Sequence, residues 1–479
     1  MADKPVIVWF RDDFRLADHP ALHAGVSSGR PVLCLYIHDE ERAGPRRPGG
    51  AARWWLHGAL DSLDAALRKY GARLALLRGS QEEILEVLAV NLEAAAVYWN
   101  RRYDKAGRDI DARLKKSLGS HGVTAKSFNG ALLHEPWTIE NKAGGAVRVF
   151  TSYWKQACRI GDPPLPLPKP EAIRSFPWPG ELAARVVSLD ALDLKPSAGP
   201  DWTQGLAETW IPGEDEALRR LDRFVAGALR GYATRRDRPD AVTTSRLSPS
   251  LCFGHISPRQ IWHRAKLAVG AGQTDATGRD LDKFLSELGW REFSYHLLYH
   301  HPDLGARNLN SRFDAMPWRG DPAALEAWRR GRTGYPLVDA GMRELWASGW
   351  MHNRVRMVVA SFLIKHLLID WREGEAWFWD TLVDADPANN AASWQWVAGS
   401  GADAAPYFRV FNPVLQGEKH DPEASYVRRW VPELARLPLS HIHKPWQAPA
   451  NMLRDAGVRL GETYPFPIVD HHQARERAL

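Results

Sequence analysis

The first 130 residues alternate short apolar runs with amphipathic stretches. Gly50–Tyr70 is the clearest helical stretch, because Leu60 and Leu67 recur on its apolar side. Strand-like and helix-like segments in strict alternation predict a parallel sheet covered by helices. The strands are expected at Val6–Phe10, Pro31–Ile37, Leu74–Leu77, Ala94–Trp99 and Val123–Phe128, and two more helices at Gln81–Val90 and Asp104–Leu118.

The loop after the first predicted strand does not carry a dinucleotide signature. The strand is followed by Arg11-Asp-Asp-Phe-Arg15 and not by GxGxxG, so the glycines that cradle phosphates in a dinucleotide site are absent. This part is therefore Rossmann-like in build, but it is a poor candidate for binding FAD or NAD in the usual place.

Residues 132–200 have a different character. Pro163–Pro170 reads PPLPLPKP, which cannot form a helix or a central strand. The segment is predicted to be a linker draped over the surface, with a short helix at Phe150–Ile160. Its length indicates a connection between two domains.

From about Asp201 the apolar spacing is helical almost to the end, with no repeat of fixed period. Helices are expected at Glu214–Arg230, Ser257–Ala268, Asp280–Tyr299, Ala323–Arg330, Leu337–Gly349, Met351–Leu368 and Glu373–Leu382. The predicted organisation is an α/β domain over residues 1–131, a linker over 132–200 and an all-α domain over 201–479.

The length and composition of the chain limit its possible domain number, location and partners. A length of 479 residues predicts two or three domains, and the absence of an apolar run of about 18 residues argues against a membrane span. Cys34, Cys158 and Cys252 are too far apart for a metal site or a disulfide framework, and the N-terminus lacks a signal-peptide pattern. A cytoplasmic protein is expected. The net charge of +6 permits nucleic-acid binding without requiring it.

The stretch Trp371–Trp396 is unusually rich in Trp. Asp384 and Asp386 precede Pro387, as in a loop that enters a helix, and Asn390 follows one turn later. Carboxylates, an amide and indoles converging on one pocket suggest a planar, redox-active cofactor. The alternative is an aromatic core between two helices.

Three further stretches can carry chemistry. Hydroxyls and backbone N–H groups in Thr244–Ser248 can hold a phosphate, with Tyr232 closing over it, although such turns are also common helix caps. Glu287, Trp290 and Arg291 share one helix face and can bind and stack a nucleobase, or they can form a surface ion pair beside a core Trp.

The third stretch is Trp350–Met357. On a continuous helix Trp350, Asn353 and Met357 would form one stripe with Arg356 beside it, while His352 would point about 100° away. A Met stripe is more often core than site, but the interleaved Asn and Arg favour the floor of a site.

These motifs together resemble the class I cyclobutane pyrimidine dimer (CPD) photolyases of the photolyase/cryptochrome family. The resemblance runs from WFRDDFRLADHPAL near the start through TSRLSPSLCFGHISPRQ, LGWREF, TGYPLVDAGMREL, GWMHNRVRM, LLIDWREGE and GADAAPYFRVFNP to YPFPIVDH. It implies an N-terminal α/β domain, a long linker and a helical FAD domain, in a protein that acts on UV-damaged DNA without a membrane or a metal. A monomer is expected.

The resemblance also implies roles for residues. Cofactor contacts are expected from Tyr232, Thr244, Ser245, Arg246, Leu247, Ser248, Glu287, Arg291, Arg356, Asp384, Asp386 and Asn390, with Arg356 as the partner of Asp384. The lesion pocket is expected to contain Glu287, Trp290, Asn353, Met357 and Trp396. Trp394, Trp371 and Trp318 match a chain that carries electrons to FAD, and Arg236, Arg354 and Arg409 match positions that face the DNA backbone.

The mechanism implied by the resemblance is light-driven repair. The dimer flips out between Trp290 and Trp396, reduced FAD gives it an electron, the ring splits and the electron returns. A tail-less cryptochrome-type light sensor and a dark FAD oxidoreductase are the alternatives. A second, antenna chromophore is expected near Tyr36–Asp39, Trp54 and Asn100–Arg108, as a folate or a deazaflavin if present; Gly107 stands where the folate pattern has an acid.

Overall fold

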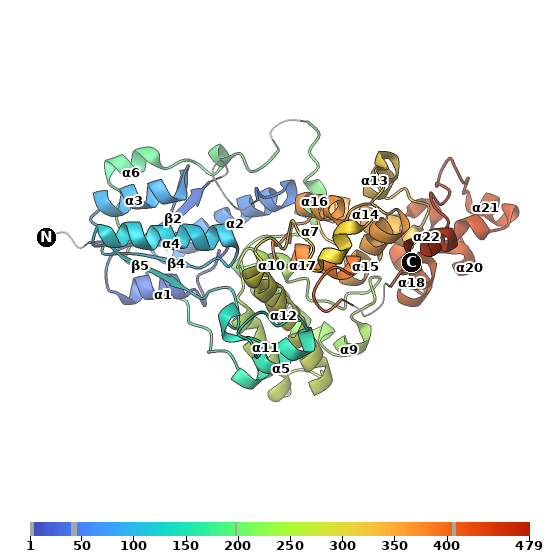
Figure 1. Cartoon of the computed structure of the whole chain (residues 1–479). Helices are drawn as coiled ribbons and strands as arrows, with labels where there is room; N and C mark the ends of the chain where they lie inside the picture. Colours follow the sequence, from blue (N-terminus) through green and yellow to red (C-terminus); the bar gives the residue numbers. More distant parts are fainter. Residues whose placement is uncertain (1–3, 40–45, 197–198, 405–408) are drawn as a thin grey trace.

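The computed structural model describes residues 4–39, 46–196, 199–404 and 409–479. An α/β part lies at one end of the molecule and helices make up the other end (Figure 1). Among the described residues, no helix has the length and apolar character that crossing a membrane requires.

The α/β part is built on one five-stranded parallel sheet, as the alternation predicts. Its strand order is β3-β2-β1-β4-β5, and every neighbouring pair is parallel. The strands are β1 (Val6–Phe10), β2 (Val32–His38), β3 (Leu74–Arg78), β4 (Ala96–Asn100) and β5 (Thr124–Phe128). β1 is central and completely buried, as expected for a strand covered on both faces.

Helices cover both faces of this sheet, which explains why β1 is apolar at every position. Val6, Val8 and Phe10 point into the core that includes residues of α1 (Pro20–Ser27) and α2 (Gly50–Lys69). The intervening residues Ile7 and Trp9 point into the opposite core, with α3 (Gln81–Asn91) and α4 (Lys105–Ser120).

The segment between the two parts is tied down along its length. Helix α5 (Phe150–Ile160) is present as predicted, and Leu165 lies exposed as expected of a surface linker. Farther on, the Ile173 N–H donates to the Tyr70 carbonyl, and Ser175 forms a β-bridge with Val32 beside the sheet. The short elements η1 (Pro136–Thr138), α6 (Gly180–Arg185) and η2 (Asp190–Leu192) complete it.

A helical part follows from α7 (Gln204–Thr209) onward. Its main helices are α8 (Glu214–Arg223), α9 (Tyr232–Arg235), α10 (Ser248–Cys252), α11 (Pro258–Gly270), α12 (Gly278–His300), α13 (Pro322–Arg329), α14 (Pro336–Ser348), α15 (Asn353–Ser361), α16 (Trp371–Thr381), α17 (Asn389–Ala398), α18 (Pro413–His420), α19 (Ser425–Trp430), α20 (Leu439–Ile442), α21 (Ala450–Ala456) and α22 (His471–Ala478). α5, α11 and α12 lie together at the bottom of Figure 1, and α20–α22 lie at the far right.

Two predicted helices are wrong in detail. The helix expected over Glu214–Arg230 is α at its start only, and a π-helical turn, η3 (Phe224–Ala228), follows. The helix expected over Met351–Leu368 begins only at Asn353 and ends in a second π-helical turn, η5 (Phe362–His366). Apolar periodicity does not distinguish an i→i+4 bond from an i→i+5 bond, so sequence reasoning missed both turns.

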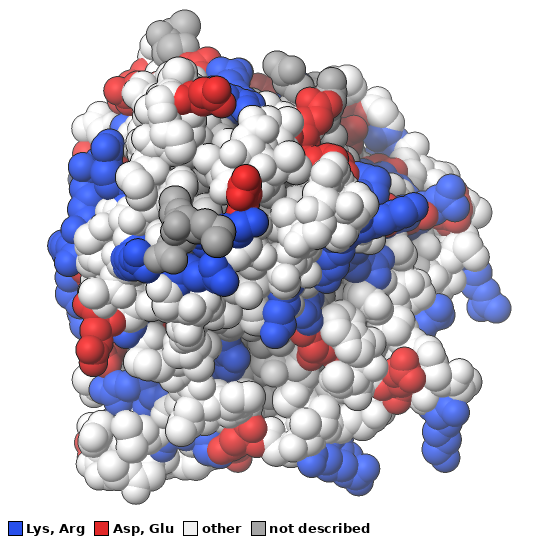
Figure 2. Space-filling model, turned by 90° about the vertical axis from the view of Figure 1, so that its left-hand side faces the viewer, with Lys and Arg blue, Asp and Glu red and all other residues white. Residues whose placement is uncertain are grey.

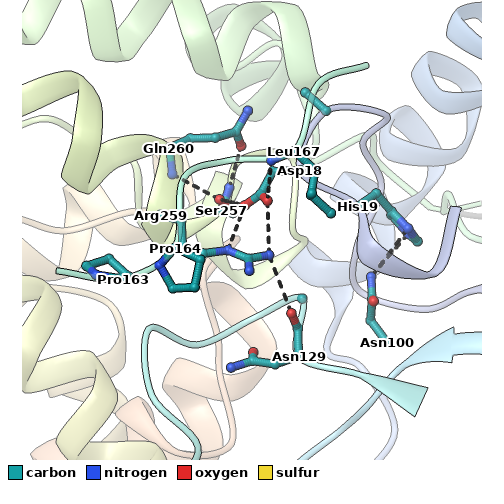
Figure 3. A network of polar contacts seen from close by, with 12 residues as sticks. Asp18, His19, Asn100, Asn129, Pro163, Pro164, Leu167, Ser257, Arg259 and Gln260 are labelled. Carbon is teal, nitrogen blue, oxygen red and sulfur yellow. Dashed lines mark hydrogen bonds and ion pairs between the residues drawn. The ribbon is translucent and has the colours of Figure 1, made fainter. Parts of the chain in front are cut away.

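The two parts meet at the buried carboxylate of Asp18, in the loop after β1 (Figure 3). Asp18 accepts a hydrogen bond from the Leu167 N–H at 3.0 Å, another from the Ser257 hydroxyl, and an ion pair from Arg259 at 3.0 Å. Ser257 in turn caps α11 in a capping box with Gln260. One carboxylate thus fixes the loop, the linker and the start of α11 in the helical part together.

Candidate functional site

A cavity of about 600 Å³ lies in the helical part, between α9, α10, α12, α15 and α17. Every residue predicted from the sequence to contact the cofactor or the lesion lines it, together with Arg236, Arg354 and Trp394. Trp318, Trp371 and Arg409 do not line this cavity. Segments more than 150 residues apart in the chain are therefore brought to one concave site, which is the usual form of a small-molecule site.

The turn at Thr244–Ser248 forms one wall. Arg246 has a positive φ of 52°, and its guanidinium lies 4.3 Å from the centre of the Trp350 ring. The Trp350 indole N–H donates to the Ser248 hydroxyl, the first residue of α10. Hydroxyls and a cation are thereby held at one turn by an indole from a different segment.

Trp350 does not lie on a helical stripe with Asn353 and Met357, which corrects the sequence interpretation. Trp350 precedes α15, and His352 is its N-cap, with ring Nδ1 accepting from the Arg354 N–H. Asn353 and Met357 do share the first turns of α15, with 4.0 Å between the Asn353 amide nitrogen and the Met357 sulfur.

The expected pairing of Arg356 with Asp384 is present. The guanidinium donates to both carboxylate oxygens, at 3.1 and 2.8 Å, and its Nε donates to the Met351 carbonyl. Only 3% of the Asp384 side chain is exposed. Such a bidentate pair fixes both side chains in the cavity wall.

Asp386 and Asn390 are engaged by the protein more than the sequence suggests. One Asp386 oxygen accepts from the N–H groups of Ala388 and Asn389, at the start of α17, and the other accepts from the Tyr295 hydroxyl. The Asn390 amide donates to the Glu375 carboxylate at 2.8 Å. Asp386 therefore also has a structural role as a helix cap.

Glu375 connects the site to the N-terminal part. Its second carboxylate oxygen lies 2.6 Å from the Arg46 guanidinium, which reaches it from the segment before α2. Trp379, on the same helix α16, donates its indole N–H to the Arg47 carbonyl. The amide at Asn390 is thus oriented by a carboxylate that an N-terminal arginine also holds.

Glu287 lines the cavity and forms ion pairs with two basic side chains. Arg236 donates to its Oε1, and the ammonium of Lys283, one helical turn earlier, lies 2.9 Å from the same atom. Trp290 stacks on Phe150 with ring centres 3.8 Å apart. This leaves an indole and a carboxylate side by side on α12, both lining the cavity.

The three tryptophans predicted to carry electrons belong to one core. Trp394 and Trp371 are buried in it, and the half-buried Trp318 packs against it. Trp394 lines the cavity, whereas the Trp371 indole N–H donates to Asn308 at 2.9 Å. Of the three, Trp394 lines the cavity and Trp318 is the most exposed, and transfer of electrons along them stays a prediction.

The predicted DNA-facing arginines occupy different positions. Arg236 and Arg354 line the cavity. Arg236 forms an ion pair with Glu287, and Arg354 forms one with Asp237. Arg409 is exposed and lines a neighbouring cavity of about 520 Å³ that shares Trp396 with the first. On the face at the α/β end, Lys and Arg side chains are interspersed with acidic and uncharged ones (Figure 2).

Several lining or supporting residues were missed from the sequence. Lys283 precedes Glu287 by four residues, a spacing that predicts an ion pair on a helix. Asp237 and Cys252 also line the cavity, but no local pattern singles them out. Arg46 could not be found at all, since its partner Glu375 is 329 residues away.

The lining fits FAD. Hydroxyls and the Arg246 cation at one wall suit phosphates and a ribityl chain. The Arg356–Asp384 pair and the Asn390 amide provide polar groups for a ring system. Apolar side chains that can flank a planar ring come from Leu247, Leu251, Phe284, Leu288, Phe378, Leu382, Trp394 and Val397.

Comparison with known proteins agrees with this fit. The family model described as DNA photolyase matches residues 6–171, and the FAD binding domain of DNA photolyase matches residues 284–479. The chain is 53% identical over 476 residues to deoxyribodipyrimidine photo-lyase of Agrobacterium fabrum, covering 99% of this chain and 97% of that protein. It is 40% identical to cryptochrome-1 of Arabidopsis thaliana, covering 98% of this chain and 69% of the relative.

Among solved structures, a bacterial class III photolyase from Agrobacterium tumefaciens matches with a TM-score of 0.94 and 51% identity, covering 100% of this chain and 97% of that one. The similar structure carries the name class III, so it does not support the class I assignment suggested by the motifs. The extent and identity of these matches show that the chain belongs to the photolyase/cryptochrome family and contains its FAD-binding domain.

Proposed function

We propose that this protein repairs UV-damaged DNA in a light-dependent reaction, splitting cyclobutane pyrimidine dimers back to two pyrimidines. The observation that carries the proposal is the shared cavity: Glu287, Trp290, Asn353, Met357 and Trp396 line the same space as the residues that suit FAD. A dimer flipped into its mouth would lie against the cofactor without an intervening wall.

The protein's own residues bind and orient the dimer. Trp290, stacked on Phe150, offers an aromatic face, and Trp396 is fixed by its indole N–H donating to the Asp403 carbonyl at 3.0 Å. Glu287 offers a polar group to the pyrimidine edge. When bound, reduced FAD supplies the light-excited electron that breaks the ring bonds.

We further propose that the chain groups with the class III photolyases and acts as a monomer. The class proposal is supported by 51% identity over the full chain to the Agrobacterium structure. Size-exclusion chromatography with light scattering tests the monomer.

One assay tests the main proposal. The purified protein, with its flavin reduced, is illuminated with blue light in the presence of a dimer-containing oligonucleotide. Repair supports the proposal. A light-induced change in the flavin spectrum without repair would favour a cryptochrome-type sensor, an alternative supported by 40% identity to Arabidopsis cryptochrome-1. The absence of both repair and a spectral change would favour a dark oxidoreductase.

The space around Gly107 limits how a second, antenna chromophore can bind. A Cβ at Gly107 would lie 2.6 Å from the Cβ of Arg102, so an acidic side chain has no room where the folate pattern has one. We propose that any second chromophore binds in another manner, and the absorption spectrum of protein from its native host tests this.

Trp318→Phe is expected to abolish or greatly slow the photoreduction of oxidised FAD by external donors. Trp318 is the half-buried end of the predicted chain, and phenylalanine is far harder to oxidise than tryptophan. Repair by chemically pre-reduced protein is expected to be retained, because it uses only the path from flavin to dimer. Loss of repair in the pre-reduced variant would contradict the assignment.

Arg409→Ala is expected to weaken binding to undamaged duplex and to reduce the salt slope of binding by about one unit, because one phosphate contact no longer releases a counterion. Arg409 is exposed beside the cavity mouth, as a backbone contact requires. Titrations by fluorescence anisotropy at several salt concentrations measure the slope. An unchanged slope would remove Arg409 from the DNA surface.

A further inference from the structure

The rim of the cavity carries a chain of alternating charges. Lys283 and Arg236 both contact Glu287, and Arg236 is also 3.9 Å from Asp237. Asp237 in turn holds the Arg354 guanidinium at 2.6 Å. All five side chains line the cavity, so the rim is an ion-pair network and not a set of free cations.

The charge state of Asp237 is fixed by its partners. Burial favours its neutral form, but the hydrogen bond from Arg354 and the charges of Arg354 and Arg236 outweigh burial and hold the pKa of Asp237 below its ordinary value. The carboxylate is therefore ionised at neutral pH. It presents an anionic oxygen to Arg354, much as a DNA phosphate would.

The arginines nevertheless keep unused donors. Among the described residues, the buried Nε atoms of Arg236 and Arg354 have no hydrogen-bond partner. Both guanidinium groups are thus only partly satisfied by the protein. These Nε atoms are buried, so an incoming phosphate can reach only the exposed part of each guanidinium, where it must compete with a carboxylate that already occupies part of the site.

We propose that Asp237 is a specificity-determining residue, which acts as an internal phosphate substitute on Arg354 and lowers affinity for undamaged DNA. This inference rests on the proposed function. Undamaged duplex offers only backbone contacts and must displace the carboxylate without further gain. A dimer-containing strand is held by contacts inside the cavity and need not displace the carboxylate, so the penalty falls mainly on undamaged duplex and widens the difference in affinity between the two.

Two possible roles of Asp237, positioning Arg354 and competing with phosphate, predict opposite changes in DNA affinity. If Asp237 only positions Arg354 for phosphate binding, its removal weakens binding to every duplex. If it competes with phosphate, its removal strengthens binding to undamaged duplex and steepens the salt dependence, because one more phosphate contact forms.

The test is a titration of undamaged and dimer-containing duplexes against wild type and Asp237→Asn at several salt concentrations. At about 0.1 M salt, Asp237→Asn is expected to bind undamaged duplex roughly fivefold to tenfold more tightly, with a salt slope steeper by about one unit. Affinity for the damaged duplex is expected to rise by less, so that the ratio between the two falls.

Two controls sharpen this result. Asp240→Asn makes the same charge change three residues away, where the carboxylate pairs with Arg238 and does not line the cavity, and it is expected to keep the wild-type slope. In an Arg354→Ala background, Asp237→Asn is expected to give no further gain, because the cation for which carboxylate and phosphate compete is absent.

Asp237→Ser is a second variant with the same expected result, and the FAD content of each variant reports whether it has folded. An undamaged-DNA slope equal to that of wild type in folded Asp237 variants, or weaker binding to both duplexes, would overturn the inference. Binding to undamaged DNA is measured in the dark, so it stands apart from the repair assay. Failure of repair would overturn the proposed function instead.

Discussion

An Asp384→Ala variant is expected to purify with far less than one FAD per chain. Asp384 accepts both guanidinium bonds of Arg356 in the cavity wall, and its own side chain is almost fully buried. Removing it leaves a partly buried cation without its counter-ion, at a cost on the order of 1–3 kcal/mol. Arg356 is then free to move into the space that the cofactor needs.

The measurement is the ratio of flavin absorbance to protein in the purified variant. Glu326→Ala is the matched control, because it removes an acid from the exposed Glu326–Arg330 pair on α13, and it is expected to retain a full complement of FAD. Stoichiometric FAD in Asp384→Ala would show that the pair does not hold the cofactor.

Selectivity for the lesion is the second large effect: repair of cyclobutane dimers is expected, and repair of 6-4 photoproducts is not. The family resemblance implies that photolyases acting on the 6-4 photoproduct use two His, at the positions of Asn353 and Met357, and need one of them to transfer a proton. An amide and a thioether cannot act as acids near neutral pH. Splitting a cyclobutane ring requires electron transfer only.

His352 does not substitute for the missing acid. It is buried at the start of α15, does not line the cavity, and burial lowers its pKa to about 4. The ring is therefore neutral at pH 7 and cannot supply a proton to the lesion pocket. Chromatography of both lesions after illumination with reduced enzyme decides the matter, and the cyclobutane substrate serves as the positive control. Turnover of the 6-4 substrate would refute this interpretation.

Local pattern was enough for the sheet. Each residue of β1 is apolar, which signals a strand covered on both faces, and the structure places alternate residues in two cores. The Arg356–Asp384 pair was predicted because the family resemblance supplied both partners. No local pattern joins two residues 28 positions apart.

The contacts that the sequence did not predict depend on partners far apart in the chain or on side-chain capping. Arg46 reaches Glu375 only because α2 and α16 pack together, and nothing within either segment indicates this. At His352, the helical period continued smoothly through the residue, yet its imidazole caps the backbone and starts the helix there. Capping by a side chain competes with helix extension, and periodicity does not measure that competition.

The Asp18 junction bears on how such chains can be inherited. The backbone N–H groups of Leu16 and Ala17, in the same loop, donate to the buried Glu214 at the start of α8. Recombination that exchanged the first 131 residues for those of a distant relative would have to preserve Asp18, Ser257, Arg259 and Glu214 together, or leave buried polar groups without partners. The sheet and the helices thus form one heritable unit, and a hydrophobic core of the sheet also contains Trp210, Trp350 and Val383 of the helical part.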